Sequence, residues 1–282
     1  MQYKILVPTG IGDFSWLWSK LSTTGDSYVI EYPKDRPPRL APFLALLPKD
    51  KVISYAVRDD VGFYFDRGEL KGHFCNAPTA TIERYSDMRE GLTNVVEANT
   101  HLERGNRIET WLPDIPQTDF HYKIEGLIDK ARSQDVFIVH LSSRIVKNSW
   151  NYYDIETWIP MIEMVEKLTG WMPVFVGGSY DDFAQECFEK YIQNHQAVSL
   201  IGRTPDLLSA LCLIQQSKFF MGAVSSGLTM LANVLRVPTA SWWPRPGLPP
   251  SWADMSIPYL WFLWKNPVSD SEHLQTFVMG LA

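Results

Sequence analysis

The chain has 282 residues, which suits one large domain or two domains of ordinary size. A hydrophobic fraction of 45% with 21% charged residues is typical of a soluble globular protein, and a net charge of −6 argues against a mainly electrostatic nucleic-acid binder. The three cysteines lack CxxC spacing, the first residues are typical of a strand and not of a signal peptide, and no apolar run is long enough to span a bilayer. We therefore expect reduced thiols and a cytoplasmic protein without a membrane span.

In the first half of the chain, predicted strands alternate with predicted helices. The strands are expected at 3–7, 27–32 and 52–57, and the helices at 14–21, 40–47 and 85–102. Residues 62–80 show no regular period, so we expect an irregular segment whose cations, Arg67, Lys71 and His73, either line an acceptor cleft or lie on the surface. Residues 112–118 contain Pro113 and Pro116 and are typical of a linker, which favours a domain boundary after residue 118.

The second half repeats this alternation. Strands are predicted at 136–141, 173–176, 198–201, 218–223 and 239–243, and helices near 120–131, at 155–168, at 181–192, after Thr204, after Gly227 and at 269–281. Pro160 is expected to kink or restart the helix at 155–168. Alternating strands and helices in both halves predict an α/β fold with two parallel sheets that are covered by helices.

Small and polar residues collect where the predicted strands end. They occur at 10–13, 142–147, 177–180, 202–204 and 225–227. In parallel sheets, ligands bind outside the carboxyl ends of the strands. The coincidence in five places predicts a ligand cleft between the two halves.

Asp13 is the candidate catalytic residue. It closes the turn Gly10-Ile11-Gly12-Asp13 after the first strand, where its carboxylate could take a proton from an acceptor hydroxyl. Gly10 and Gly12 allow a tight turn and a close approach of a ligand to the backbone. The simpler alternative is a plain strand-to-helix turn in which Asp13 caps the helix.

Candidates for binding a donor follow the strands of the second half. Cations there could neutralise a diphosphate, hydroxyls and N–H groups at a helix start could bind phosphate or ribose, and a glycine pair beside a tyrosine could accept a nucleobase. Surface charge, helix capping and a tight turn are the simpler alternatives. The candidates are Ser142, Ser143, Arg144, Lys147, Gly177, Gly178, Tyr180, Thr204, Ser225, Ser226 and Gly227.

Two further observations limit the chemistry. His140 lies inside a predicted buried strand, where a core histidine with a hydrogen-bond partner is expected. No group of His, Cys and Asp residues has the spacing of metal ligands, so neither a metal nor a cofactor is predicted.

Four segments then point to a family. The turn GIGD resembles the G-x-G-D opening of family 9 glycosyltransferases, the ADP-heptose:lipopolysaccharide heptosyltransferase group. In the second half, SSRIVKNSW, PVFVGG and LIGRTPDLLSALCLIQQSKFFMGAVSSGLTMLANVLRVPT are similar in order to segments of the same family. Two positions depart from it, because Ser225 stands where the family has an acidic residue and Met230 where it has a histidine.

The resemblance implies a GT-B fold, in which two Rossmann-like domains with parallel sheets face each other across a cleft. It places an acceptor-side domain at 1–118, a donor domain at 119–265 and a C-terminal helix at 266–282 that returns to the first domain. It also implies an inverting, metal-independent transfer of a sugar from a nucleotide-diphospho-sugar, the co-substrate, to an acceptor hydroxyl. Asp13 would be the base, Lys147 would hold the donor diphosphate, and Ser226 and Gly227 would meet the donor at a helix start.

The acceptor and the activity itself have alternatives. A glycan acceptor is favoured. A hydroxylated base in DNA, as in phage DNA glycosyltransferases of the same fold, is the second possibility, with a local basic rim formed by residues 34–39 and 49–58. The third is a catalytically degenerate GT-B protein that binds a nucleotide or a sugar, suggested by Ser225 and Met230. The sugar and the oligomeric state are left open.

Overall fold

The structure is a computed structural model of the whole chain. It describes residues 2–6, 27–33, 52–58, 61–66, 69–74, 135–140, 155–178, 182–195, 197–204, 207–223, 226–242, 255–262 and 267–282. The chain divides into two compact units, residues 1–114 and 115–282. The predicted domain boundaries after 118 and 265 stay predictions, because the residues on either side of them lie outside the described ranges.

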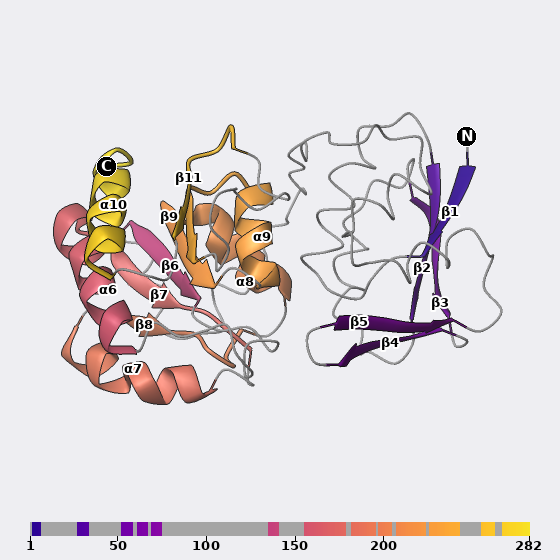
Figure 1. The fold of residues 1–282 in the computed structure, drawn as a ribbon, viewed down its shortest axis with the longest axis horizontal. Helices are drawn as coiled ribbons and strands as arrows, with labels where there is room; N and C mark the ends of the chain where they lie inside the picture. Colours follow the sequence, from indigo (N-terminus) through magenta and orange to yellow (C-terminus); the bar gives the residue numbers. More distant parts are fainter. Residues whose placement is uncertain are drawn as a thin grey trace. The chain divides into compact units, whose positions relative to one another are not determined.

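The second unit contains a parallel sheet of six strands in the order β11-β10-β9-β6-β7-β8 (Figure 1). These strands confirm the five that the sequence predicts here and add β11. Their bounds are β6 Val136–His140, β7 Met172–Phe175, β8 Val198–Ser199, β9 Phe219–Ala223, β10 Thr239–Trp242 and β11 Tyr259–Phe262.

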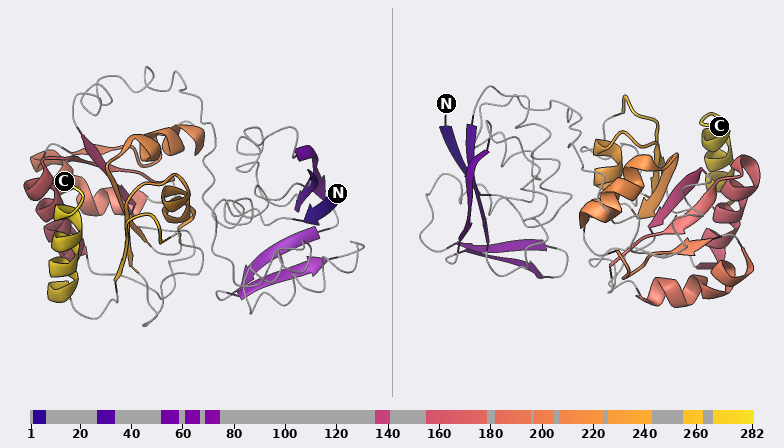
Figure 2. Two further views of the ribbon diagram at one scale, coloured as in Figure 1. Left: turned by 90° about the horizontal axis from the view of Figure 1, so that it is seen from above. Right: turned by 180° about the vertical axis from the view of Figure 1, so that it is seen from behind.

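Helices cover both faces of this sheet, which explains why β6, β7, β9 and β11 are nearly continuous apolar runs. The described helices are α6 Ile155–Thr169, α7 Asp182–Asn194, α8 Leu207–Gln216, α9 Gly227–Val234 and α10 Pro267–Met279. Figures 1 and 2 show α6 and α10 on one side of the sheet and α8 and α9 on the other. None of the helices in the described part of the chain is long and apolar enough to cross a membrane.

The main core lies between the sheet and the layer formed by α6, α7 and α10. Alternate residues of the central strands point into it, so that Phe137 of β6 and Phe219 of β9 are fully buried with ring centroids 6.3 Å apart. Leu274 and Val278 of α10 are buried in the same core. The resemblance implies that this last helix also returns to the first unit, and that contact stays a prediction.

Pro160 does not interrupt α6, so the predicted restart is wrong: the helix is continuous from Ile155 to Thr169. The predicted kink stays a prediction. Proline removes one helical hydrogen bond and crowds the preceding turn. Pro160 is exposed, whereas Trp158, Met161 and Ile162 beside it are buried. Packing of this apolar face on the sheet therefore outweighs the local cost of the proline.

The first unit contains a parallel sheet in the order β1-β2-β3, with β1 at Gln2–Leu6, β2 at Ser27–Pro33 and β3 at Val52–Arg58. These strands confirm the three that the sequence predicts in this half. The helices predicted at 14–21, 40–47 and 85–102 lie outside the described residues.

The prediction of an irregular segment at 62–80 is wrong for its first part. Strands β4 (Val61–Asp66) and β5 (Glu69–Phe74) pair antiparallel, with Asp66 opposite Glu69. Strand β4 is rich in aromatic and β-branched residues, which favour extended backbone. Only Arg67 and Gly68 separate the paired strands in the sequence, and a two-residue connection with glycine is a hairpin signal that the lack of a simple period obscures.

Candidate functional site

The strand order of the second unit reverses between β6 and β9. From β6 the chain proceeds to β7 and then β8 on one side, and it next forms β9 on the other side of β6. The connections that leave β6 and β9 therefore diverge at their carboxyl ends. A reversal of this kind opens a crevice at the edge of an α/β sheet, and ligands bind there.

Helix α9 begins at this crevice, immediately after β9. Ser226 is its N-cap, with extended backbone angles (φ −85°, ψ 135°), and its Oγ accepts a hydrogen bond from the N–H of Leu228 at 3.1 Å. The N–H of Met230 donates to the carbonyl oxygen of Ser226 at 3.3 Å. The first N–H groups of a helix and its dipole make the N-terminus favourable for an anion, here at the carboxyl edge beside β6.

The first turn of α9 is packed closely against the sheet at Gly222. A Cβ atom on Gly222 would lie 2.5 Å from Cε1 of Phe220, 2.8 Å from Oγ1 of Thr229 and 3.2 Å from the carbonyl oxygen of His140. Thr229 belongs to the first turn of α9 and is fully buried. The helix start therefore has its present position because residue 222 of β9 has no side chain.

Polar side chains occupy the same face of the sheet beside Gly222. His140 of β6 and Ser241 of β10 are the register neighbours of Gly222 on either side, and both are buried. The Nδ1–H of His140 donates to the carbonyl oxygen of Val176 at 2.9 Å, which confirms the expectation of a buried histidine with a partner. The Ser241 hydroxyl hydrogen-bonds that of Tyr259, and burial raises the pKa of Tyr259, so the phenol stays protonated.

The carboxyl ends of β7 and β8 are also joined. The N–H of Gly202 donates to the carbonyl oxygen of Gly177 at 3.0 Å, and the N–H of Arg203 donates to that of Leu200 at 3.0 Å. Gly202 has φ +66°, which is the conformation that the third position of a type II turn requires and that glycine adopts without strain. The turn after β8 thus lies against the glycine pair that follows β7.

The predicted donor-side residues that the structure describes all follow carboxyl ends of this sheet: Gly177 and Gly178 after β7, Thr204 after β8, and Ser226 and Gly227 after β9. A backbone hydrogen bond connects Gly177 to the turn that precedes Thr204. Ser226 and Gly227 follow β9, which lies on the other side of β6 from β7 and β8. The remaining candidates lie outside the described residues: Gly10, Gly12, Asp13, Ser142, Ser143, Arg144, Lys147, Tyr180 and Ser225.

Sequence reasoning missed Gly222 and Thr229, which position the start of α9. A glycine inside an apolar strand often marks a close approach of another segment, so Gly222 in the run Phe219–Ala223 was a usable signal. The sequence contains no such signal for Thr229, because its contact with residue 222 depends on how the helix crosses the sheet.

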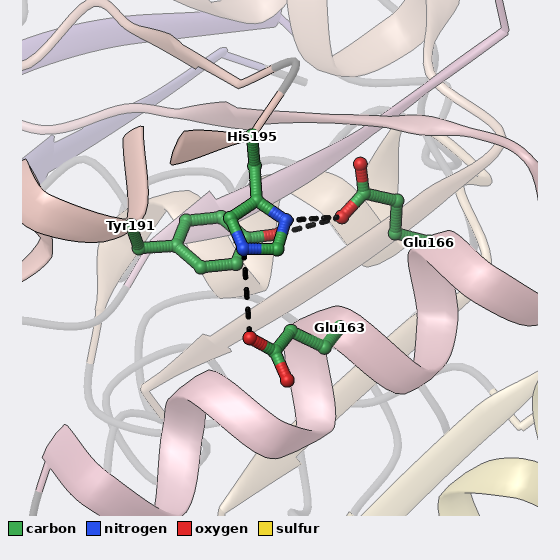
Figure 3. Close-up of polar contacts among 4 residues, drawn as sticks. All are labelled: Glu163, Glu166, Tyr191 and His195. Atoms are coloured by element: carbon green, nitrogen blue, oxygen red, sulfur yellow. Dashed lines mark hydrogen bonds and ion pairs between the residues drawn. The ribbon is translucent and has the colours of Figure 1, made fainter. Parts of the chain in front are cut away.

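A second polar cluster joins α6 to α7 (Figure 3). The Tyr191 hydroxyl donates to Oε2 of Glu166 at 2.9 Å, Nδ1 of His195 lies 3.3 Å from the same oxygen, and Nε2 of His195 lies 3.6 Å from Oε1 of Glu163. The rings of Tyr191 and His195 stack with centroids 4.1 Å apart. His195 immediately precedes β8, so the cluster lies toward the amino ends of the strands, away from the crevice. Among the described residues, no three His, Cys, Asp or Glu side chains are placed to hold a metal ion.

The strand order and the helix start at its reversal define a Rossmann-like α/β unit, and the chain as a whole has the GT-B fold, which confirms the predicted fold class. The facing of its two domains across a cleft stays a prediction. Neither a family model nor a curated protein matches the sequence.

Solved structures match nearly the whole chain. The E. coli ADP-heptose lps heptosyltransferase II is similar with a TM-score of 0.58 and 13% identity, over 99% of this chain and 99% of that chain. The E. coli heptosyltransferase WaaC, solved with ADP-2-deoxy-2-fluoro heptose, is similar with a TM-score of 0.52 and 13% identity over the full length of both chains. A family 9 glycosyl transferase from Veillonella parvula is similar with a TM-score of 0.51 and 13% identity, over 97% of this chain and 89% of that chain. The likeness is thus to structures of the group that the sequence motifs resemble, and at this identity it shows a shared fold.

Proposed function

We propose that the protein is a glycosyltransferase that moves a sugar from a nucleotide-diphospho-sugar to an acceptor hydroxyl. The observation that carries this proposal is the start of α9 at the reversal of strand order between β6 and β9. Helix N-termini bind anions, and nucleotides bind α/β sheets where the strand order reverses. The start of α9 meets both conditions. The GT-B fold, shared with heptosyltransferases over nearly the whole chain, supports the same conclusion.

The donor diphosphate is the natural ligand of this edge. Its negative charge would be stabilised by the N–H groups at the start of α9 and by the Ser226 hydroxyl. Lys147 and Arg144, which follow β6 in the sequence, are proposed to neutralise the remaining charge. Ser142 and Ser143 would bind phosphate or ribose beside them, as would Ser225. Gly177, Gly178 and Tyr180 are proposed to accept the nucleobase.

The reaction that we propose is a single inverting displacement. The acceptor oxygen forms a bond to the anomeric carbon as the bond from that carbon to the diphosphate oxygen breaks, and its electron pair leaves with the nucleoside diphosphate. The carboxylate of Asp13 takes the proton of the acceptor hydroxyl. Stabilisation of the leaving diphosphate by backbone N–H groups and side-chain cations would replace a metal ion, so the transfer is proposed to be metal-independent.

The proposed acceptor is a glycan, with Gly10 and Gly12 allowing it to approach the backbone near Asp13. The test is an assay of a panel of nucleotide sugars with glycan and with hydroxymethylated duplex DNA, in the presence of a chelator. Sugar transfer or donor hydrolysis supports the proposal, and transfer to DNA alone would replace the glycan by a base. Binding of a nucleoside diphosphate without turnover of any donor would favour a degenerate binding protein and contradict a transferase.

Asp13→Asn tests the proposed base. The amide cannot accept the proton, so we expect turnover to fall by about 100-fold or more while the affinity for the donor stays nearly unchanged. Initial rates and calorimetric titration with the donor measure the two effects. Unchanged turnover in the variant would remove Asp13 from the mechanism.

A further inference from the structure

Gly222 lies directly beneath the first turn of α9, at the edge proposed to bind the donor. It is the penultimate residue of β9, between His140 on β6 and Ser241 on β10. On the helix side it faces Thr229, whose Oγ1 would be 2.8 Å from a Cβ atom at residue 222. A separation below about 3.0 Å is too short for carbon and oxygen, so one of the two elements would have to move.

The sheet is the element that resists movement. The carbonyl oxygen of His140, 3.2 Å from the added atom, belongs to a strand that pairs with β9 on one side and β7 on the other. Phe220, whose Cε1 is the nearest atom at 2.5 Å, is fully buried, and its ring centroid lies 6.4 Å from that of His140. In a close-packed interior neither group has free space to enter.

The helix is the element that can move. Thr229 is fully buried and β-branched, so it has few χ1 rotamers and little free space in which to turn Oγ1 away. The contact between a side chain at 222 and Thr229 is therefore relieved by displacing the first turn of α9 away from the sheet, and that displacement also gives the ring of Phe220 room to shift. That turn carries Ser226, its cap, and the N–H group of Leu228.

We propose that Gly222 is a positioning residue for donor binding: its missing side chain holds the start of α9 against β9, so that the N–H groups of Ser226 and Gly227 meet the donor diphosphate. This inference rests on the proposed function. Hydrogen bonds to a phosphate require donor and acceptor within about 3 Å, so a displacement of several tenths of an ångström weakens several of them together.

The test compares Gly222→Ala with Gly170→Ala by two measurements. Gly170 follows α6, has φ +71° and has no atom within 4 Å of an added Cβ, so its substitution strains the backbone far from the crevice. The first measurement is calorimetric affinity for ADP and for UDP. The second is hydrogen exchange of the amides of residues 226–230 without ligand, which reports the packing of α9 whether or not a nucleotide binds.

We expect Gly222→Ala to weaken nucleoside diphosphate binding by about tenfold or more and to speed exchange at 226–230, while Gly170→Ala changes neither. Thr229→Ile, which adds volume from the helix side, should act as Gly222→Ala does and serves if that variant does not fold. Wild-type exchange rates at 226–230 in folded variants would overturn the positioning role. A wild-type protein that binds neither ADP nor UDP contradicts the proposed function and overturns the assignment of the ligand, while exchange still decides whether Gly222 seats the helix.

Discussion

At the scale of single residues, the ends of two helices show how backbone conformation selects side chains. Helix α9 ends with the N–H of Val237 donating to the carbonyl oxygen of Ala232 and that of Arg236 donating to Asn233, both at 3.0 Å. This pair of bonds is a Schellman motif, which requires a left-handed residue after the helix. Gly170 meets the corresponding need after α6, whereas after α9 the residue is Arg236, with φ +61°.

Replacing Arg236 by glycine should therefore stabilise the protein. A residue with a Cβ atom in the left-handed region costs about 1 kcal/mol that glycine avoids, so we expect the free energy of unfolding to rise by about 0.5–1 kcal/mol. Urea unfolding measures the change, and Gly170→Ala should lower stability by a similar amount. A loss of stability in Arg236→Gly would show that the arginine side chain contributes more than its backbone conformation costs.

Asp270 makes stability depend on pH. It lies in the first turn of α10 and is 5% exposed, and burial raises its pKa to about 6, partly opposed by the neighbouring His273. Because the pKa in the folded protein is above the ordinary value of 3.8, folding favours the protonated carboxyl. The contribution of this group to stability is complete below pH 3.8 and is lost as the pH rises through about 6.

Asp270→Asn should accordingly be more stable than the wild type at neutral pH, by on the order of 1–3 kcal/mol. The advantage should shrink as the pH falls through the window between the two pKa values, because the wild-type carboxyl is then neutral as well. Denaturant titrations at a series of pH values test both statements. An advantage of the same size at every pH would assign it to packing and not to charge.

At the scale of elements, the sequence predicts where strands and helices occur better than how they pack. The five strands predicted in the second half are all present, because a sheet covered on both faces needs continuous apolar runs such as Val136–His140. The continuity of α6 through Pro160 and the hairpin of β4 and β5 were missed. In the first case tertiary packing outweighs a local rule, and in the second a turn signal was hidden among charged residues.

The same difference holds for the residues of the candidate site: local patterns predict some of them, and only tertiary contacts reveal the others. Ser226 and Gly227 were predicted from a local pattern, a polar cap before an apolar helix face, and the structure shows the cap. The role of Gly222 depends on Thr229, seven residues away on another element, and on His140, more than eighty residues earlier. Such contacts follow from the order of the strands, which no local pattern contains.

The contact between α6 and α7 gives a prediction at this scale. Tyr191 is buried, and its hydroxyl donates to a carboxylate oxygen of Glu166, so Tyr191→Phe should lower the free energy of unfolding by about 1.5–3 kcal/mol. Glu163 is about half exposed and 3.6 Å from His195, so Glu163→Gln should cost less than about 1 kcal/mol. Chemical denaturation of both variants gives the comparison. Equal losses would mean that His195, and not the tyrosine hydroxyl, joins the two helices.

At the scale of the whole molecule, the proposed function depends on one edge of one sheet. The GT-B fold is shared with heptosyltransferases at 13% identity, which fixes the architecture and leaves the chemistry to the residues at the carboxyl ends of the strands. In the described part of the chain, those residues are the glycines after β7, the turn after β8 and the capped start of α9. The proposed function requires that this last feature bind the donor diphosphate.

A crystal structure of the protein with a bound nucleoside diphosphate would show whether it does. We predict a phosphate oxygen within hydrogen-bond distance of the backbone N–H groups of Ser226 and Gly227, at the carboxyl ends of β6 and β9. A diphosphate bound elsewhere on the chain, with no contact to the start of α9, would show that this helix start is not the donor site.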